Sequence, residues 1–150
     1  MKLIALLTLF IVALSAAVAR ADAVTDWNVG TGEVIVEAKL ARQPAVRNTA
    51  IVQTAAHQAV MAEQQRGASV EAARAAAHRV NLNRVLQAQQ PMIEAAYQAA
   101  LGAATDNAAK LDGIADGEAA AQAVLAARTD DGAAAPETYR PFTTAGVYVP

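Results

Sequence analysis

The stretch "PMIEAAYQAALG", residues 91–102, has the clearest helical periodicity in the chain. Its apolar side chains recur at intervals of three and four residues: Ile93, Ala96, Tyr97, Ala100 and Leu101. Such spacing gathers side chains on one face of an α-helix, whereas a half-buried strand would alternate every second residue. Proline fits the first turn of a helix and glycine commonly ends one. The stretch therefore predicts a helix whose apolar face must pack against other helices.

Four further segments carry weaker versions of the same pattern. They are residues 32–40, for which an earlier start stays open, and residues 42–67, 69–89 and 105–128. No segment of regular strand-like alternation is found before the C-terminal arm, and the predicted loops have about two to six residues, as between antiparallel neighbours. We therefore expect an all-α fold of about five helices in an antiparallel, bundle-like arrangement.

Several residues mark the expected helix ends. Pro44 suits the first turn of the second helix, and Gly67 ends it. Ser69 is an expected N-cap of the third helix, which Pro91 stops near residue 89. Thr105 or Asp106 is the expected cap of the last helix. The apolar face of that helix comprises Ile114, Gly117, Ala121, Val124 and Leu125.

Alanine dominates the composition and limits the core. It supplies 41 of the 150 residues, so most of the 55% hydrophobic content is a single methyl group. Because stabilisation scales with buried apolar area, the expected core is modest. Trp27, the one tryptophan, is expected inside it. Gly113 and Gly117 lie one helical turn apart, which is tolerable where a neighbouring helix packs closely.

Residues 1–21 have the anatomy of a secretory signal peptide. Lys2 precedes an apolar run, and an A-x-A triplet ends at Ala21. Cleavage there would start the mature chain at Asp22, with 12 − 2 = 10 basic against 14 acidic residues. We expect an exported protein, periplasmic or secreted, with no nucleic-acid partner and no membrane association after cleavage. The alternative is an uncleaved membrane anchor.

The side chains that could carry chemistry are few. There is no cysteine, and no phosphate-binding loop or nucleophile elbow is present. His57 and His78 could form a metal or haem pair, with Met61 or Glu63 as a further ligand. The alternative is that each histidine is an ordinary solvated or hydrogen-bonded residue, because metal sites normally need three or four ligands. We assign no catalytic, cofactor-binding or metal-binding residue.

Two carboxylate pairs have a helical spacing at which acid–base chemistry is conceivable. Glu33 and Glu37 share one helix face, and so do Asp112 and Asp116. Paired carboxylates can transfer protons, but on alanine-rich helices such pairs usually face solvent.

The C-terminal segment differs from everything before it. "PETYRPFTTAGVYVP", residues 136–150, contains three prolines and three aromatic side chains. The expected organisation is a signal peptide at 1–21, a helical domain at 22–132 and an extended arm at 133–150.

Five stretches together resemble one family. They are "TDWNVGTGEVIVEAKL", "RNTAIVQTAAHQAV", "QQPMIEAAYQAAL", "GEAAAQAVLAARTDDG" and "PETYRPFTTAGVYVP". They resemble the N-terminal part of exported bacterial relatives of the vanadium-dependent haloperoxidases, in the superfamily that includes the type 2 phosphatidic acid phosphatases. The resemblance implies a helical N-terminal part, followed by a second all-α part that binds vanadate or phosphate.

The motifs of that second part are K-x₆-R-P, P-S-G-H and S-R-x₅-H, and none of them occurs here. Arg140 and Pro141 form an R-P pair, but the position seven before Arg140 is Ala133 rather than lysine. The expectation is therefore a non-catalytic N-terminal fragment that holds no cofactor, with vanadate implied only for full-length relatives. Its expected partner is the missing catalytic half or another protein surface.

Two other interpretations stay open at this point. One is an independent periplasmic helical protein with a binding or chaperone-like role. The other is a metal- or haem-binding bundle that uses His57, His78 or Met61.

Overall fold

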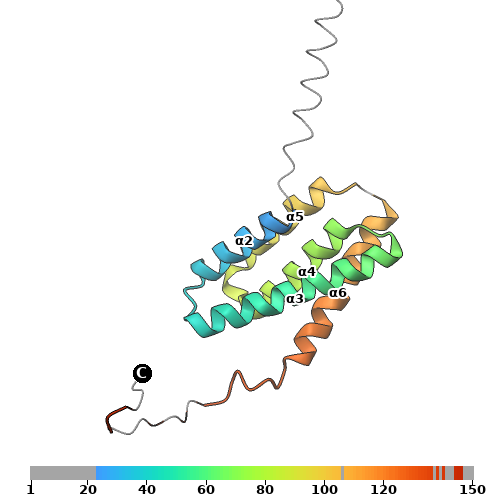
Figure 1. Ribbon diagram of the computed structural model, residues 1–150. Coiled ribbons are helices and arrows are strands. Elements are labelled where there is room, and N and C mark those ends of the chain that lie inside the picture. The colour runs from blue at the N-terminus through green and yellow to red at the C-terminus, as the bar shows by residue number, and fades with distance from the viewer. Residues whose placement is uncertain (1–22, 106, 137, 139, 141–143, 147–150) are drawn as a thin grey trace, which may run out of the picture.

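The computed structural model describes residues 23–105, 107–136, 138, 140 and 144–146. Within these residues the chain forms five α-helices and one short 3₁₀ turn, and no strand. The helices pack as a bundle, followed by a segment that leaves the end of the last helix (Figure 1). The expected all-α class is confirmed.

Helix α2 spans Ala23–Glu37, so it begins well before residue 32 and takes the earlier start that the sequence leaves open. The reason is packing. Trp27, Thr31, Val34 and Ile35 are all buried and recur at helical spacing, so one face of the segment is held against the bundle. Lys39 has a left-handed backbone (φ 51°), and the helix ends before it.

Helices α3 (Arg42–Arg66) and α4 (Val70–Val85) form a helical hairpin. Gly67 ends α3 with a positive φ of 74°, and its N–H donates to the carbonyl of Glu63. The Ser69 hydroxyl accepts from the N–H of Ala72 and caps α4. Both features were predicted, because capping depends on residues close together in the sequence.

Helix α4 ends at Val85 rather than near residue 89. Residues Gln87–Gln89 form the 3₁₀ turn, and α5 follows as Gln90–Ala103 with Pro91 in its first turn. The early end allows Leu86 and Ile93 to be buried in the same apolar cluster on either side of the turn. The predicted helix of residues 91–102 is confirmed within α5.

Helix α6 spans Ala108–Ala127, and its cap is Asn107, whose side chain accepts from the N–H of Lys110 at 3.0 Å. The expected caps were Thr105 or Asp106. Thr105 is not the cap, and residue 106 lies outside the described part. Asparagine is as good a cap as aspartate, so the helix begins one or two residues later than expected but with the same kind of cap.

The glycines of α6 allow it to lie very close to α4. A β-carbon on Gly113 would lie 2.5 Å from the carbonyl oxygen of Ser69, and one on Gly117 would overlap the carbonyl oxygen of Ala73. Because Gly113 lies opposite Ser69 and Gly117 lies opposite Ala73, α4 and α6 run in the same direction. The close packing predicted for the two glycines is confirmed.

Helix α4 is the centre of the bundle, and it contacts all four other α-helices. Its buried residues surround the helix rather than forming one stripe. Five of the eight are alanine; the buried residues are Ala72, Ala73, Ala75, Ala76, Ala77, His78, Asn81 and Leu82. Small side chains at these positions let the neighbouring helices approach on every side. The alanine content that limits the core area is thus also what permits the central helix.

Two predictions concern residues that are largely outside the described part. The signal peptide at 1–21 lies wholly there. Of the arm at 133–150, residues 133–136, 138, 140 and 144–146 are described, and all of them are exposed.

Candidate functional site

A cavity of about 200 Å³ lies between α3 and α4. Its lining residues are Gln53, Ala56, His57, Val60, Arg74 and His78. The first four come from α3 and the last two from α4, one turn apart. Both histidines, His57 and His78, line this cavity together with the half-buried side chain of Arg74.

His78 is held in one orientation by its surroundings. Its ring stacks on Trp27 of α2, with the ring centroids 4.5 Å apart. Its Nδ1 lies 2.9 Å from the carbonyl oxygen of Arg74. Because a carbonyl can only accept, Nδ1 carries the proton, and Nε2 presents a lone pair. Nε2 is buried and has no hydrogen-bond partner in the structure.

Burial lowers the pKa of His78 to about 4. The backbone hydrogen bond to Arg74 opposes this fall, and the positive charge of the Arg74 side chain adds to it. At neutral pH the ring is therefore neutral. It can accept a hydrogen bond at Nε2, or bind a metal there, without first losing a proton.

The structure brings some of the candidate ligands together and separates others. His57 and His78 line the same cavity, as a histidine pair requires. Met61 is exposed, and neither it nor Glu63 lines the cavity. In the described part of the chain, no three histidine or carboxylate side chains converge in a way that could hold a metal ion.

Glu63 belongs to a second cluster, with Asp116 and Arg66. Glu63 is 1% exposed, and neither of its carboxyl oxygens has a hydrogen-bond partner of good geometry. Burial raises the pKa of Glu63, and the adjacent Asp116 adds to the rise. Asp116 Oδ1 accepts from Arg66 Nη1 at 2.6 Å, while its Oδ2 is buried without a partner. A proton on Glu63 would supply the donor that Asp116 Oδ2 lacks.

The predicted carboxylate pairs do not form acid–base pairs. Glu33 and Glu37 are both exposed on α2. Asp112 is exposed, whereas Asp116 turns toward Arg66 and Glu63. The carboxylate pair that does exist joins α3 to α6, so no spacing within one helix could have indicated it.

A third polar cluster links α4, α5 and α6. Arg79 Nε donates to both oxygens of Glu94 at 2.9 and 3.0 Å, and Asn83 donates to one of them at 2.7 Å. Burial raises the pKa of Glu94, but these hydrogen bonds outweigh it and lower the pKa. The guanidinium also lies 4.9 Å from the ring centroid of Tyr97 and 3.6 Å from Glu118. With every charge paired, this cluster is structural.

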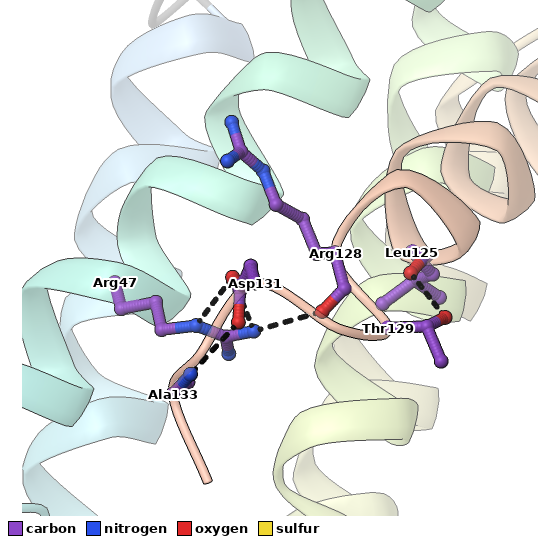
Figure 2. A network of polar contacts seen from close by, with 6 residues as sticks. All are labelled: Arg47, Leu125, Arg128, Thr129, Asp131 and Ala133. Carbon is purple, nitrogen blue, oxygen red and sulfur yellow. Dashed lines mark hydrogen bonds and ion pairs between the residues drawn. The ribbon is translucent and has the colours of Figure 1, made fainter. Parts of the chain in front are cut away.

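A fourth cluster fixes the chain where it leaves α6 (Figure 2). Arg47 of α3 donates from Nε and Nη2 to Asp131 Oδ2 at 3.0 and 2.8 Å. Its Nη2 also reaches the carbonyl oxygen of Arg128 at 3.4 Å. The N–H of Ala133 donates to Asp131 Oδ1, which together with Arg47 lowers the pKa of Asp131. The resemblance gave Arg140, Pro141 and Ala133 no role, and residue 141 lies outside the described part of the chain.

Sequence reasoning missed Arg74 and Gln53. The signal for Arg74 was its position four residues before His78, on the same helix face. Gln53 lies four residues before His57 in the same way, and its amide is fixed by a hydrogen bond to Asn28 of α2 at 2.5 Å.

Comparison with known protein families, curated proteins and solved structures finds no match to this chain. A separate search of the described helices finds none with the length and apolar character needed to cross a membrane.

Proposed function

We propose that this helical bundle is the structural N-terminal segment of an exported protein similar to the vanadium-dependent haloperoxidases and the type 2 phosphatidic acid phosphatases. In such a protein, a second all-α part would bind vanadate or phosphate and carry out halide oxidation or phosphate ester hydrolysis. The bundle would hold that part in place rather than perform the chemistry.

The supporting observation is how two of the resembling stretches meet in space. "RNTAIVQTAAHQAV" lies in α3, and "GEAAAQAVLAARTDDG" covers the end of α6 and the residues after it. Arg47, the first residue of one stretch, pairs with Asp131, near the end of the other, across 84 residues of sequence. Chance similarity between alanine-rich helices would not require the charged ends of two stretches to pair.

The same two stretches also build one apolar cluster. Ile51, Ala55 and Ala59 from the first pack with Ala121 and Val124 from the second, around alanines of α4. The two stretches thus contribute to one apolar cluster of the bundle, as residues of a shared structural unit would.

The nucleotide sequence after codon 150 tests the proposal. Codons for P-S-G-H and S-R-x₅-H there, in any reading frame, would support it. An unrelated gene with its own start would contradict it and favour the second candidate, an independent periplasmic helical binding or chaperone-like protein. The cavity between α3 and α4 is the observation in favour of that candidate.

Activity assays give a second test. Purified chain from residue 22, supplied with vanadate, peroxide and bromide, is expected not to brominate a dye above background. It is also expected not to release phosphate from a phosphomonoester, because an oxyanion site needs several converging donors. Saturable turnover that His57→Ala or His78→Ala abolishes would place an active site in this chain.

A further inference from the structure

The cavity between α3 and α4 has the chemistry of a small binding site. At about 200 Å³ it is smaller than the pockets of roughly 300–1,000 Å³ that hold drug-sized ligands. Ala56 and Val60 give it an apolar wall, and the remaining lining residues are polar: Gln53, His57, Arg74 and His78. Its occupant must therefore be small and able to form several hydrogen bonds.

His78, which lines the cavity, carries a buried acceptor that has no partner within the protein. His78 Nε2 is buried and unpaired, and a buried acceptor without a partner destabilises the protein. The Gln53 amide nitrogen donates one hydrogen to Asn28, so the amide oxygen and the second amide hydrogen can both contact an occupant. His78 Nε2 cannot bind a carboxylate oxygen, because it carries no hydrogen when Nδ1 donates to the carbonyl of Arg74.

Arg74 is a positive charge at the cavity, and it favours an occupant that carries a negative charge. Arg47, Arg66 and Arg79 each pair with a carboxylate. The half-buried Arg74 side chain forms no ion pair with any described residue, and no carboxylate lines the cavity. A planar guanidinium in this setting is suited to bind a carboxylate group.

We propose that this cavity binds a small hydroxycarboxylate, with its carboxylate on Arg74 and its hydroxyl donating to His78 Nε2. The hydroxyl is preferred over an ammonium donor, because an ammonium group would place a second positive charge beside Arg74 with no carboxylate to balance it. A divalent metal ion is disfavoured for the same reason. The proposal is independent of the proposed function and applies equally to a segment of a larger protein.

The test uses ¹⁵N-labelled full chain titrated with lactate, propionate and alanine as probes. Lactate carries the hydroxyl, propionate lacks it, and alanine replaces it with an ammonium group. The expected result is a saturable shift of the His78 Nε2 resonance with lactate, accompanied by a change in Trp27 fluorescence. Propionate and alanine should bind at least about tenfold more weakly, since an unpaired acceptor is worth about 1.4 kcal/mol or more.

Two arginine variants complete the design. Arg74→Gln should weaken lactate binding at least about tenfold, whereas Arg84→Gln, an exposed arginine on the same helix, should leave it unchanged. Circular dichroism verifies that both variants remain folded. A dissociation constant of about 10 mM corresponds to a binding free energy of only about −3 kcal/mol. If lactate at concentrations up to about 10 mM leaves the His78 resonance unmoved, the proposal is wrong. Equal binding of lactate and propionate, or no effect of Arg74→Gln, would also overturn it.

Discussion

At the scale of single residues, His78 makes the stability of the protein sensitive to acid. Its pKa in the folded protein, about 4, lies below the value of 6.5 for a free side chain. As pH falls from 6.5 toward 4, the unfolded chain takes up a proton that the folded chain does not. The stabilisation is therefore complete above pH 6.5 and is lost across that window, with an upper limit of about 3 kcal/mol.

His78→Gln should remove this part of the acid sensitivity. Glutamine keeps an amide donor for the carbonyl of Arg74 but does not titrate. Its free energy of unfolding, from urea titrations between pH 7 and pH 4, is expected to fall less steeply than that of the unmodified protein. His57→Gln, at the exposed histidine, should retain the steep fall. Equal slopes in the unmodified protein and the His78 variant would contradict the prediction.

Glu63 has the opposite dependence on pH. Its pKa in the folded protein is raised, so its contribution to stability is complete below pH 4.5 and is lost as pH rises through the folded pKa. Glu63→Gln should therefore stabilise the protein at pH 7 by about 1 kcal/mol, because the amide can donate to Asp116 without adding a charge. The gain should shrink in acid, where Glu63 is itself protonated.

Urea titrations of the Glu63 variant at pH 7 and pH 4.5 measure the gain in the free energy of unfolding and its decrease in acid. Glu33→Gln, on the exposed face of α2, provides the control and should change stability little. Destabilisation by Glu63→Gln at pH 7 would mean that the carboxylate is ionised and well paired.

At the scale of helices, the contact between α4 and α6 depends on Gly117. Gly117→Ala should destabilise the protein by about 2 kcal/mol or more, because the new methyl group overlaps the backbone of Ala73 and forces the helices apart. This outweighs the gain of about 1 kcal/mol in helix propensity. Thermal unfolding measures the difference.

Gly102→Ala is the matched control for that substitution. Gly102 lies in α5 with no atom near the position of an added β-carbon. The change should therefore be neutral or stabilising by at most about 1 kcal/mol. If both alanine variants had equal stability, close packing would not explain Gly117.

The helix ends show which parts of the fold could be read from the sequence. Gly67 and Ser69 were predicted correctly, because each acts through hydrogen bonds to residues three or four positions away. The start of α2 stayed open in the sequence, since it depends on the burial of Trp27 against α4. The early end of α4 likewise follows from tertiary burial of Leu86.

The same distinction explains the candidate site. His57 and His78 were recognised as a potential pair because histidines are rare in this chain. The partner of each charged residue was harder to predict. Arg74 resembles any solvated arginine on an alanine-rich helix, and only its place beside the cavity separates it from the arginines that pair with carboxylates. Glu63 and Asp116 lie on different helices, so their contact required the three-dimensional structure.

At the scale of the whole molecule, the Arg47–Asp131 pair ties the end of α6 back to the start of α3. Arg47→Gln should lower global stability by at most about 1 kcal/mol, because both side chains are partly exposed to water. It should also increase amide hydrogen exchange at Ala133, whose N–H donates to Asp131. Arg42→Gln, at the exposed first residue of α3, should change neither measurement. Unchanged exchange at Ala133 in the Arg47 variant would mean that the pair does not hold this segment.

The segment beyond that pair should contribute little to the stability of the bundle. Every described residue from 133 onward is exposed, and among the described residues the three apolar clusters extend no further than Val124 and Leu125. Deleting residues 133–150 should therefore change the free energy of unfolding by less than about 1 kcal/mol, as for other surface changes.

Tyr97→Ala provides the comparison for that deletion. Tyr97 is 6% exposed and packs in the cluster around Trp27, so its truncation should cost about 3 kcal/mol or more. If the deletion costs as much as Tyr97→Ala, aromatic residues of the arm are buried against the bundle, and the arm belongs to its core.

Amide exchange discriminates the two cases without mutation. Near-unfolded exchange rates at residues 138–146 are expected for a segment that packs on something other than this bundle, whereas strong protection there would favour an independent domain that includes its own arm.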